Sequence, residues 1–375
     1  MYVGWMKRNI YIAIAALAVC GLFVALHISP KRQPVSIGFV GPFTGNSAFF
    51  GEYMQRGLDI ARSEYSADDI SRVRIIKEDD ACSAKNALSA VQKLISVDHV
   101  KYVIGPLCNE SSVATEQLFE DSRVISVTIG LPSNKIANMG PYHFSFSPEI
   151  EYLMKAISGE IIKKKITRVA VIHMIGAFED ENYRHFIKYL SMGGVWLAAD
   201  VSEIKGTTDF KASILKIKQS NPDGIMIVAH TAELNNILKQ MDAQGLRGLQ
   251  KFGIHAAETK LLLEQKDIAE GFIYPYPGDD AESQSAKSYA QKYADAYHAA
   301  PDPSSVNVYN SYKILISAIG ECGYENSDCV QRKLSQLKDF PGASGSLSVD
   351  ERGVGTYKQI MLKTVHNGKF EKLSE

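Results

Sequence analysis

The chain has 375 residues, of which 45% are hydrophobic and 22% are charged, and its 41 basic and 42 acidic residues leave a formal net charge of -1. This composition excludes an intrinsically disordered chain and a coiled coil, and the length suits about two domains. Because no basic run exceeds Lys163, Lys164 and Lys165, the chain offers no electrostatic footprint for nucleic acid. We therefore expect no nucleic-acid partner.

The N-terminus contains a strongly apolar segment. Residues 10–28 (IYIAIAALAVCGLFVALHI) lack charged side chains, and a helix of that length would rise about 28 Å, close to a bilayer core of about 30 Å. We predict an uncleaved signal-anchor in the inner membrane within residues 1–34. The alternatives are a signal peptide cleaved near residues 16–18 (ALA), which would leave a soluble periplasmic protein, and lipidation at Cys20. All three place the chain from about Ser29 at the periplasmic or extracellular face.

Strand and helix patterns alternate in the first part of the exported chain. The expected strands are residues 34–42, 72–80, 100–106 and 123–130, and the expected helices between them are residues 51–65, 86–98 and 111–121. Such alternation predicts a parallel sheet with helices on both faces. This part forms a first α/β lobe.

The alternation then restarts and predicts a second α/β lobe. Its expected helices are residues 151–165, 181–194, 209–220 and 232–245, and its expected strands are residues 168–173, 195–201, 224–230, 251–256 and 271–277. Three further helices are expected at residues 285–300, 306–322 and 331–340, before a hairpin-like pair at residues 344–350 and 356–365. Because ligands bind at the carboxyl ends of strands in such sheets, two facing lobes would enclose a cleft.

The cysteines outside the apolar segment form two pairs by sequence, Cys82 with Cys108 and Cys322 with Cys329. An even number fits disulfides in an oxidising compartment, and four buried thiols are the alternative. No CxxC motif occurs, which argues against zinc and thioredoxin chemistry. The motifs of metalloproteases, serine hydrolases and phosphate-binding loops are also absent, so we expect no enzyme, no cofactor and no resident metal.

Several ordered segments resemble a known family, the type I periplasmic substrate-binding proteins of the leucine/isoleucine/valine-binding branch. They include IGFVGPFTGNSAFFGEYMQRGLDIA, EDDACSAKNALSAVQKLI, KYVIGPLCNESS, TTDFKASILKIKQSNPDGIMIV and DFPGASGSLSVDERG. The resemblance implies two doubly wound parallel-sheet lobes joined by three crossovers, near Ser147, Pro277 and Ser348. Lobe one would comprise residues 35–147 plus 278–348, and lobe two residues 148–277 plus 349–375.

The same resemblance implies a function and a disulfide. Cys82 would pair with Cys108. The protein would close its cleft on a small polar ligand, an amino acid or a similar molecule, and deliver it to the permease subunits of an ABC transporter. A membrane-tethered sensory or protein-interaction module with a diverged cleft is the alternative.

The resemblance also indicates ligand-binding residues in each lobe. In lobe one, Phe50 would form an aromatic wall, Asn109 stands where the amino-acid binders have a carboxylate-holding hydroxyl, and Gly130, Leu131 and Ser133 follow a strand. The helix that follows, capped by Ser111 and Ser112, would supply further N–H groups for an anion beside Asn109. The alternative is that Asn109 merely caps this helix.

In lobe two, Phe178 replaces a tyrosine, His230 replaces another aromatic residue, and His255 replaces the acid that clamps the ligand ammonium, with Glu258 as a possible substitute. His173 also ends an apolar run, as do His230 and His255. If their strands are adjacent, three imidazoles would gather at the cleft edge, where they could contact an anionic ligand or bind a transition metal. The acidic run at residues 179–181 is interpreted as a solvated loop or helix start, with a contact to a cationic ligand as the alternative.

Overall fold

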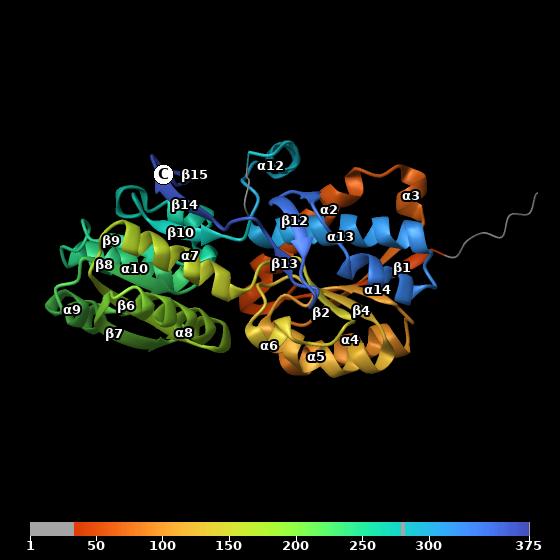
Figure 1. Cartoon of the computed structure of the whole chain (residues 1–375), viewed down its shortest axis with the longest axis horizontal. Helices are drawn as coiled ribbons and strands as arrows, with labels where there is room; N and C mark the ends of the chain where they lie inside the picture. The colour runs from red at the N-terminus through yellow and green to blue at the C-terminus, as the bar shows by residue number, and fades with distance from the viewer. Residues whose placement is uncertain (1–33, 279–281, 375) are drawn as a thin grey trace, which may run out of the picture.

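A computed structural model of the chain describes residues 34–278 and 282–374. Two lobes lie side by side along the long axis of the molecule (Figure 1). The apolar segment at residues 10–28 lies outside the described residues. Within the described part of the chain, no helix is long and apolar enough to cross a membrane.

Lobe one is built on a sheet of five parallel strands in the order β2-β1-β3-β4-β5. The strands are β1 (Val35–Gly41), β2 (Val73–Asp79), β3 (Tyr102–Ile104), β4 (Ile125–Thr128) and β5 (His143–Ser145). Alternate side chains face opposite sides of the sheet, so Ile37 and Phe39 enter one core and Val40 enters the other.

Helices cover both faces of this sheet. One face packs on α2 (Ala48–Ser63), α12 (Gln284–Tyr297), α13 (Pro303–Cys322) and α14 (Ser327–Ser335), and the other on α4 (Ala84–Ser96) and α5 (Asn109–Ser122). Lobe one also contains η1 (Gly45–Ser47), α3 (Ala67–Ser71), α6 (Asn134–Ala137) and a small antiparallel sheet of β11 (Phe340–Gly342), β12 (Gly345–Val349) and β13 (Gly355–Thr356). Cys322 and Cys329 form a disulfide that joins the end of α13 to α14.

Lobe two is built on a seven-stranded sheet in the order β15-β14-β10-β9-β8-β6-β7. Its strands are β6 (Arg168–Ile175), β7 (Trp196–Ile204), β8 (Gly224–Val228), β9 (Gln250–Gly253), β10 (Ile273–Tyr276), β14 (Met361–His366) and β15 (Lys369–Lys372). One face packs on α7 (Ile150–Lys163) and α8 (Ala177–Met192), and the other on α9 (Lys211–Gln219), α10 (Thr231–Ala243) and α11 (Lys260–Leu263). The short helices η2 (His255–Ala257) and η3 (Lys266–Ile268) complete the lobe.

The chain passes between the lobes three times, as predicted for this fold class: between β5 and α7, between β10 and α12, and between β13 and β14. The first two crossings fall where they were expected, whereas the third follows β13 because Ser348, its expected place, lies inside β12 of lobe one. Arg352, in the turn between β12 and β13, forms ion pairs with Asp350 of the same turn and with Glu149 of the first connection. The backbone N–H of Ser145 donates to the carbonyl of Gly353 at 3.1 Å. These contacts fasten the β12–β13 turn to the first connection at the hinge.

The predicted C-terminal hairpin is only partly correct. β12 pairs with β13 through Ser348 and Thr356, but β13 has only two residues. β14 instead pairs antiparallel with β10, where Thr364 lies opposite Ile273. The residues of β14 therefore do not return to the predicted hairpin. They pair with β10 instead, whose backbone N–H and C=O groups at the sheet edge need partners.

Candidate ligand-binding site

A cavity of about 900 Å³ lies between the two lobes. This volume is in the range of small-molecule sites. Seven of the eight predicted ligand residues line it: Phe50, Asn109, Gly130, Leu131, Phe178, His230 and His255. All but Phe50 follow the carboxyl end of a strand, which is where ligands bind in open α/β sheets.

Asn109 occupies the first position of α5 and is 8% exposed. The N-cap is Cys108, whose carbonyl accepts from the N–H of Ser112 at 2.9 Å. Ser111 and Ser112 therefore lie within the first turn, and the prediction that they cap the helix is wrong. The start of α5 still presents N–H groups and the positive end of the helix dipole toward the cavity, an arrangement that suits a carboxylate.

Gly130 allows the loop after β4 to approach the start of α5. A side-chain Cβ at this position would collide with the backbone carbonyl oxygen of Leu107 and would lie 3.8 Å from the Asn109 side chain. Leu131 follows and is 4% exposed. The absence of a side chain at Gly130 therefore lets the loop after β4 approach the segment before α5 this closely in the lobe-one wall.

Ser133 does not line the cavity with the other seven residues. It is the N-cap of α6, where its hydroxyl oxygen accepts from the backbone N–H of Ile136 at 3.3 Å. The four residues of α6 turn the chain away after Leu131. The structure thus gives Ser133 a capping position rather than a place on the wall.

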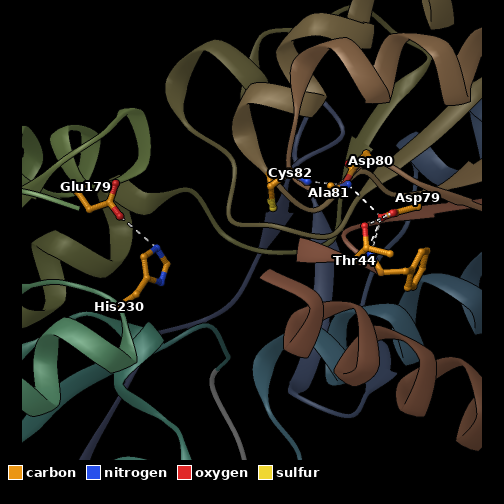
Figure 2. Close-up of a disulfide and its surroundings, with 9 residues drawn as sticks. Thr44, Asp79, Asp80, Ala81, Cys82, Glu179 and His230 are labelled. Carbon is orange, nitrogen blue, oxygen red and sulfur yellow. Dashed lines mark hydrogen bonds and ion pairs between the residues drawn. A yellow bond between two sulfur atoms is a disulfide. The ribbon is translucent and has the colours of Figure 1, made fainter. Parts of the chain in front are cut away.

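The disulfide between Cys82 and Cys108 lies in the lobe-one wall, with both residues among those lining the cavity. Figure 2 shows the loop that carries Cys82 and its contacts to the segment before α2. The Asp79 carboxylate accepts from the N–H groups of Phe43 at 2.8 Å, Thr44 at 3.2 Å and Ala81 at 3.0 Å. Burial alone would raise the pKa of the Asp79 carboxyl. These bonds and one from the Thr44 hydroxyl favour the ionised form more strongly, so the pKa lies below its usual value.

Four rings from both lobes meet inside the cavity. Phe178, in the first turn of α8, stacks on His230 with centroids 5.5 Å apart and meets His255 edge to face at 5.7 Å. Phe50 of lobe one meets His230 edge to face at 6.1 Å. We call Phe50, Phe178, His230 and His255 the four-ring cluster, and its contact between Phe50 and His230 joins the two lobes across the cleft.

A buried carboxylate lies directly behind the cluster. Glu179 is fully buried, with His230 Nε2 at 3.2 Å from one oxygen and Lys205 Nζ at 2.8 Å from the other. Figure 2 shows the Glu179 to His230 pair. Burial raises the pKa of Glu179, but His230 and Lys205 outweigh burial and hold the pKa below its usual value. Glu179 therefore orients the His230 ring toward the cavity, and the prediction that residues 179–181 form a solvated helix start is wrong for Glu179.

His255 and Glu258 lie further along the lobe-two wall. Burial, together with the nearby His230, lowers the pKa of His255 to about 3. The imidazole is therefore neutral at pH 7. Glu258 is 8% exposed, accepts from the Tyr274 hydroxyl at 3.0 Å and forms an ion pair with Lys363. Its carboxylate is thus already neutralised within lobe two.

His173 does not join the other two imidazoles. The strands β6, β8 and β9 are adjacent, as expected. However, His173 lies inside β6 on the face covered by α7 and α8, where its ring stacks on Tyr183 with centroids 4.1 Å apart. His230 and His255 follow the ends of their strands and so reach the cavity. Among the described residues, no group of three or more side chains is arranged to hold a metal ion.

Sequence reasoning missed Asp302 and misjudged Glu179. Glu179 was grouped with its exposed neighbour Asp180, and the only available signal was its place directly after Phe178. Asp302 lines the cavity as the N-cap of α13, where it accepts from the N–H of Ser304 at 2.8 Å, and burial raises its pKa to about 6. The Asp-Pro-Ser pattern at the start of an apolar helix was the available signal there.

The two lobes, the cavity between them and the hinge define a cleft-type ligand-binding protein. Residues 34–364 match the family described as periplasmic binding protein, and the chain belongs to this family. The prediction of a binding protein rather than an enzyme is thereby confirmed, and the family fits a location outside the cytoplasm.

Relatives share the family over nearly the whole chain. A leucine-, isoleucine-, valine-, threonine- and alanine-binding protein of Pseudomonas aeruginosa is 24% identical, over 90% of this chain and 91% of that protein. Among solved structures, a leucine-binding protein of Thermotoga maritima superposes with a TM-score of 0.82 at 22% identity, over 91% of this chain and 98% of that chain. An ABC-transporter solute-binding protein of Rhodopseudomonas palustris, in complex with 3,4-dihydroxybenzoic acid, also superposes with a TM-score of 0.82. It is 19% identical, over 91% of this chain and 96% of that chain. These structures support the fold.

Proposed function

We propose that the protein is an exported receptor that closes its cleft on a small carboxylate-bearing ligand and delivers it to the permease subunits of an ABC transporter. The observation that carries this proposal is the cavity of about 900 Å³ between the lobes, to which both lobes contribute rings. The names of the relatives support the ligand class, since they bind branched-chain amino acids or an aromatic acid.

Closure would proceed by rotation at the hinge. A ligand that contacts both walls stabilises the closed form over the open form by its additional contacts to the second wall. Across the cleft the N–H of Asn134 donates to the Glu181 carboxylate at 3.3 Å, and Phe50 meets His230. Direct contacts between the lobes are few, so the ligand would supply most of the attraction in the closed form.

The ligand residues that we propose are the seven predicted residues that line the cavity, together with Glu179 as the residue that positions His230. Ser133 is left out of the proposed site because it caps α6. We also propose the predicted lobe limits, residues 35–147 plus 278–348 and residues 148–277 plus 349–375. The separate hydrophobic clusters of the two lobes support these limits except at residue 349, since Val349 packs in the lobe-one cluster and β13 pairs with β12.

For the N-terminus we propose a membrane anchor at residues 10–28, with a cleaved signal peptide as the alternative. The flanking charges and the length of the uncharged segment support the anchor. An anchor would keep the receptor near its transporter and raise its effective concentration there.

A thermal-shift screen of the full chain in detergent tests the ligand proposal, with amino acids, their 2-oxo analogues and aromatic acids as probes. A ligand at 100 times its Kd should add about 2.7 kcal/mol of stability. We expect Phe50→Ala and Phe178→Ala each to weaken the best compound at least about tenfold, which corresponds to about 1.4 kcal/mol. The matched control is Tyr152→Ala, an exposed aromatic residue on α7. A screen in which no small molecule stabilises the protein would contradict the proposal.

A further inference from the structure

Asp302 is a buried acidic residue of the lobe-one wall that has no cationic partner among the described residues. It is 8% exposed and lines the cavity together with the next two residues, Pro303 and Ser304. As the N-cap of α13 it uses only Oδ1, which accepts from the N–H groups of Ser304 at 2.8 Å and Ser305 at 3.2 Å. Oδ2 is buried and has no hydrogen-bond partner in the described part of the chain. The carboxylate therefore keeps acceptor capacity that the fold does not use.

The helix start does not explain why this residue is charged. A serine or an asparagine caps a helix about as well as an aspartate. The cap bonds and the dipole of α13 favour the ionised carboxyl, yet burial outweighs them and raises the pKa of Asp302 to about 6. Arg56 lies over the Tyr53 ring on the same side of the lobe but forms its ion pair with Glu52. The other titratable neighbours are tyrosines whose pKa values are raised by burial and by Asp302: Tyr53, Tyr276, Tyr289 and Tyr293.

The other buried acids at the cavity are already neutralised within lobe two. Glu179 is paired with Lys205 and His230, and Glu258 is paired with Lys363. The remaining acidic residues of the lining are exposed or half-buried, where water screens their charge: Glu110, Glu233 and Glu264. A cationic group of a bound ligand would therefore find its desolvated counter-charge in lobe one.

Bonds within lobe one hold the start of α13 close to the start of α5. Asn307, in the second turn of α13, donates from its amide to the carbonyl of Ile129 and to the hydroxyl of Ser147 at 2.7 Å. Ile129 and Ser147 line the cavity, and Ile129 directly precedes Gly130, which meets the segment before α5. One small molecule can thus place a carboxylate at the start of α5 and a cation at Asp302.

We propose that Asp302 holds a protonated nitrogen of the ligand, so that the cleft selects small carboxylates that also carry an amine. Lobe one then binds both charged groups, and the rings of lobe two cover the rest of the molecule. His255, which is neutral at pH 7, does not supply this counter-charge. The inference rests on the proposed function, because it requires that a small carboxylate enters the cavity, and it adds the residue and the chemical group that decide between similar acids.

Calorimetric titration of the full chain in detergent tests this with amino acids of the screen and their 2-oxo analogues, which keep the carboxylate and the side chain but lose the amine. We expect the parent protein to bind the amine-bearing compound at least about tenfold more tightly. Asp302→Asn should remove most of this preference and leave the affinity for the 2-oxo analogue within about threefold. Asparagine preserves the cap of α13, and Asp302→Ser repeats the test with another capping residue if the first variant does not fold.

The matched control is Glu110→Gln, which removes one negative charge from an exposed position of the same lobe-one lining and should leave the preference unchanged. A preference that survives in Asp302→Asn, an equal loss in Glu110→Gln, or a best compound without an amine would overturn the proposal. So would a crystal structure of the parent complex in which the ligand nitrogen lies beyond hydrogen-bond distance of Asp302. If no small carboxylate binds the parent protein, the proposed function fails as well, and this outcome is distinct from binding without an amine preference.

Discussion

The two walls of the cleft are built by different means. The lobe-one wall depends mainly on backbone: the start of α5, the missing side chain of Gly130 and the covalent link between Cys82 and Cys108. The lobe-two wall depends on titratable side chains, with His230 held by Glu179 and a neutral His255 beside it. Lobe one therefore fixes the shape of the site and adds one titratable group, Asp302, whereas lobe two supplies the two imidazoles.

The largest expected effect comes from removing the disulfide of the lobe-one wall. In the chain-entropy account, opening a loop that spans 26 positions between Cys82 and Cys108 costs about 3.5 kcal/mol of unfolding free energy. Because both residues line the cavity, Cys82→Ser with Cys108→Ser should also weaken the best compound of the screen. Urea unfolding and calorimetric binding measure the two effects.

The second disulfide is the matched control. Cys322 and Cys329 are separated by 7 positions and lie away from the cavity, so their replacement should cost about 2.5 kcal/mol and leave the Kd unchanged. Equal effects of the two pairs on ligand affinity would show that the lobe-one wall does not depend on its covalent link.

Gly130→Ala tests the same wall by a steric route. The added methyl group would meet a backbone carbonyl, which cannot rotate away as a side chain can, so we expect a loss of up to about 3 kcal/mol of unfolding free energy and weaker ligand binding. Gly159→Ala is the control, because nothing lies within 4 Å of the added group. In the middle of α7 that substitution should stabilise by about 0.5–1 kcal/mol. Two losses of similar size would refute the steric explanation.

The sequence predicts the architecture well, because burial pattern and chain order determine it. Strand ends bring seven of the eight predicted ligand residues to one cavity. What could not be predicted depends on side-chain direction. His173 lies on a strand adjacent to that of His230, yet its position inside β6 turns the ring to the other side, toward Tyr183. Glu179 appeared as one residue of an acidic run, and only the packing of Lys205 and His230 around it shows that it is buried.

The pH dependence of stability tests the lobe-two wall. The folded state holds the pKa of His255 at about 3, below its ordinary value of 6.5, so the unfolded chain binds this proton first as the pH falls. The contribution of His255 is therefore complete above pH 6.5 and is lost as pH falls from there toward 3. Between pH 7 and pH 5 the loss should reach about 2 kcal/mol, and less where cavity water reaches the ring.

Urea unfolding at several pH values measures this loss, and His255→Asn should flatten the dependence. His99→Asn is the control, since His99 is exposed and its left-handed backbone (φ 50) accepts asparagine. If the His255 and His99 variants kept the same slope as the parent protein, titration of the lobe-two wall would not account for the pH response.

Ser133→Ala should have the smallest effect and marks the edge of the lobe-one wall. Loss of the cap removes the bond from the Ile136 N–H and should cost about 1 kcal/mol of unfolding free energy. Because Ser133 lies outside the cavity lining, the Kd of the best compound should not change, whereas Asn109→Ala, a residue on the wall, should raise it. A rise in Kd for Ser133→Ala as large as for Asn109→Ala would extend the site past α6, and the lobe-one wall would then contain a side-chain hydroxyl as well as backbone.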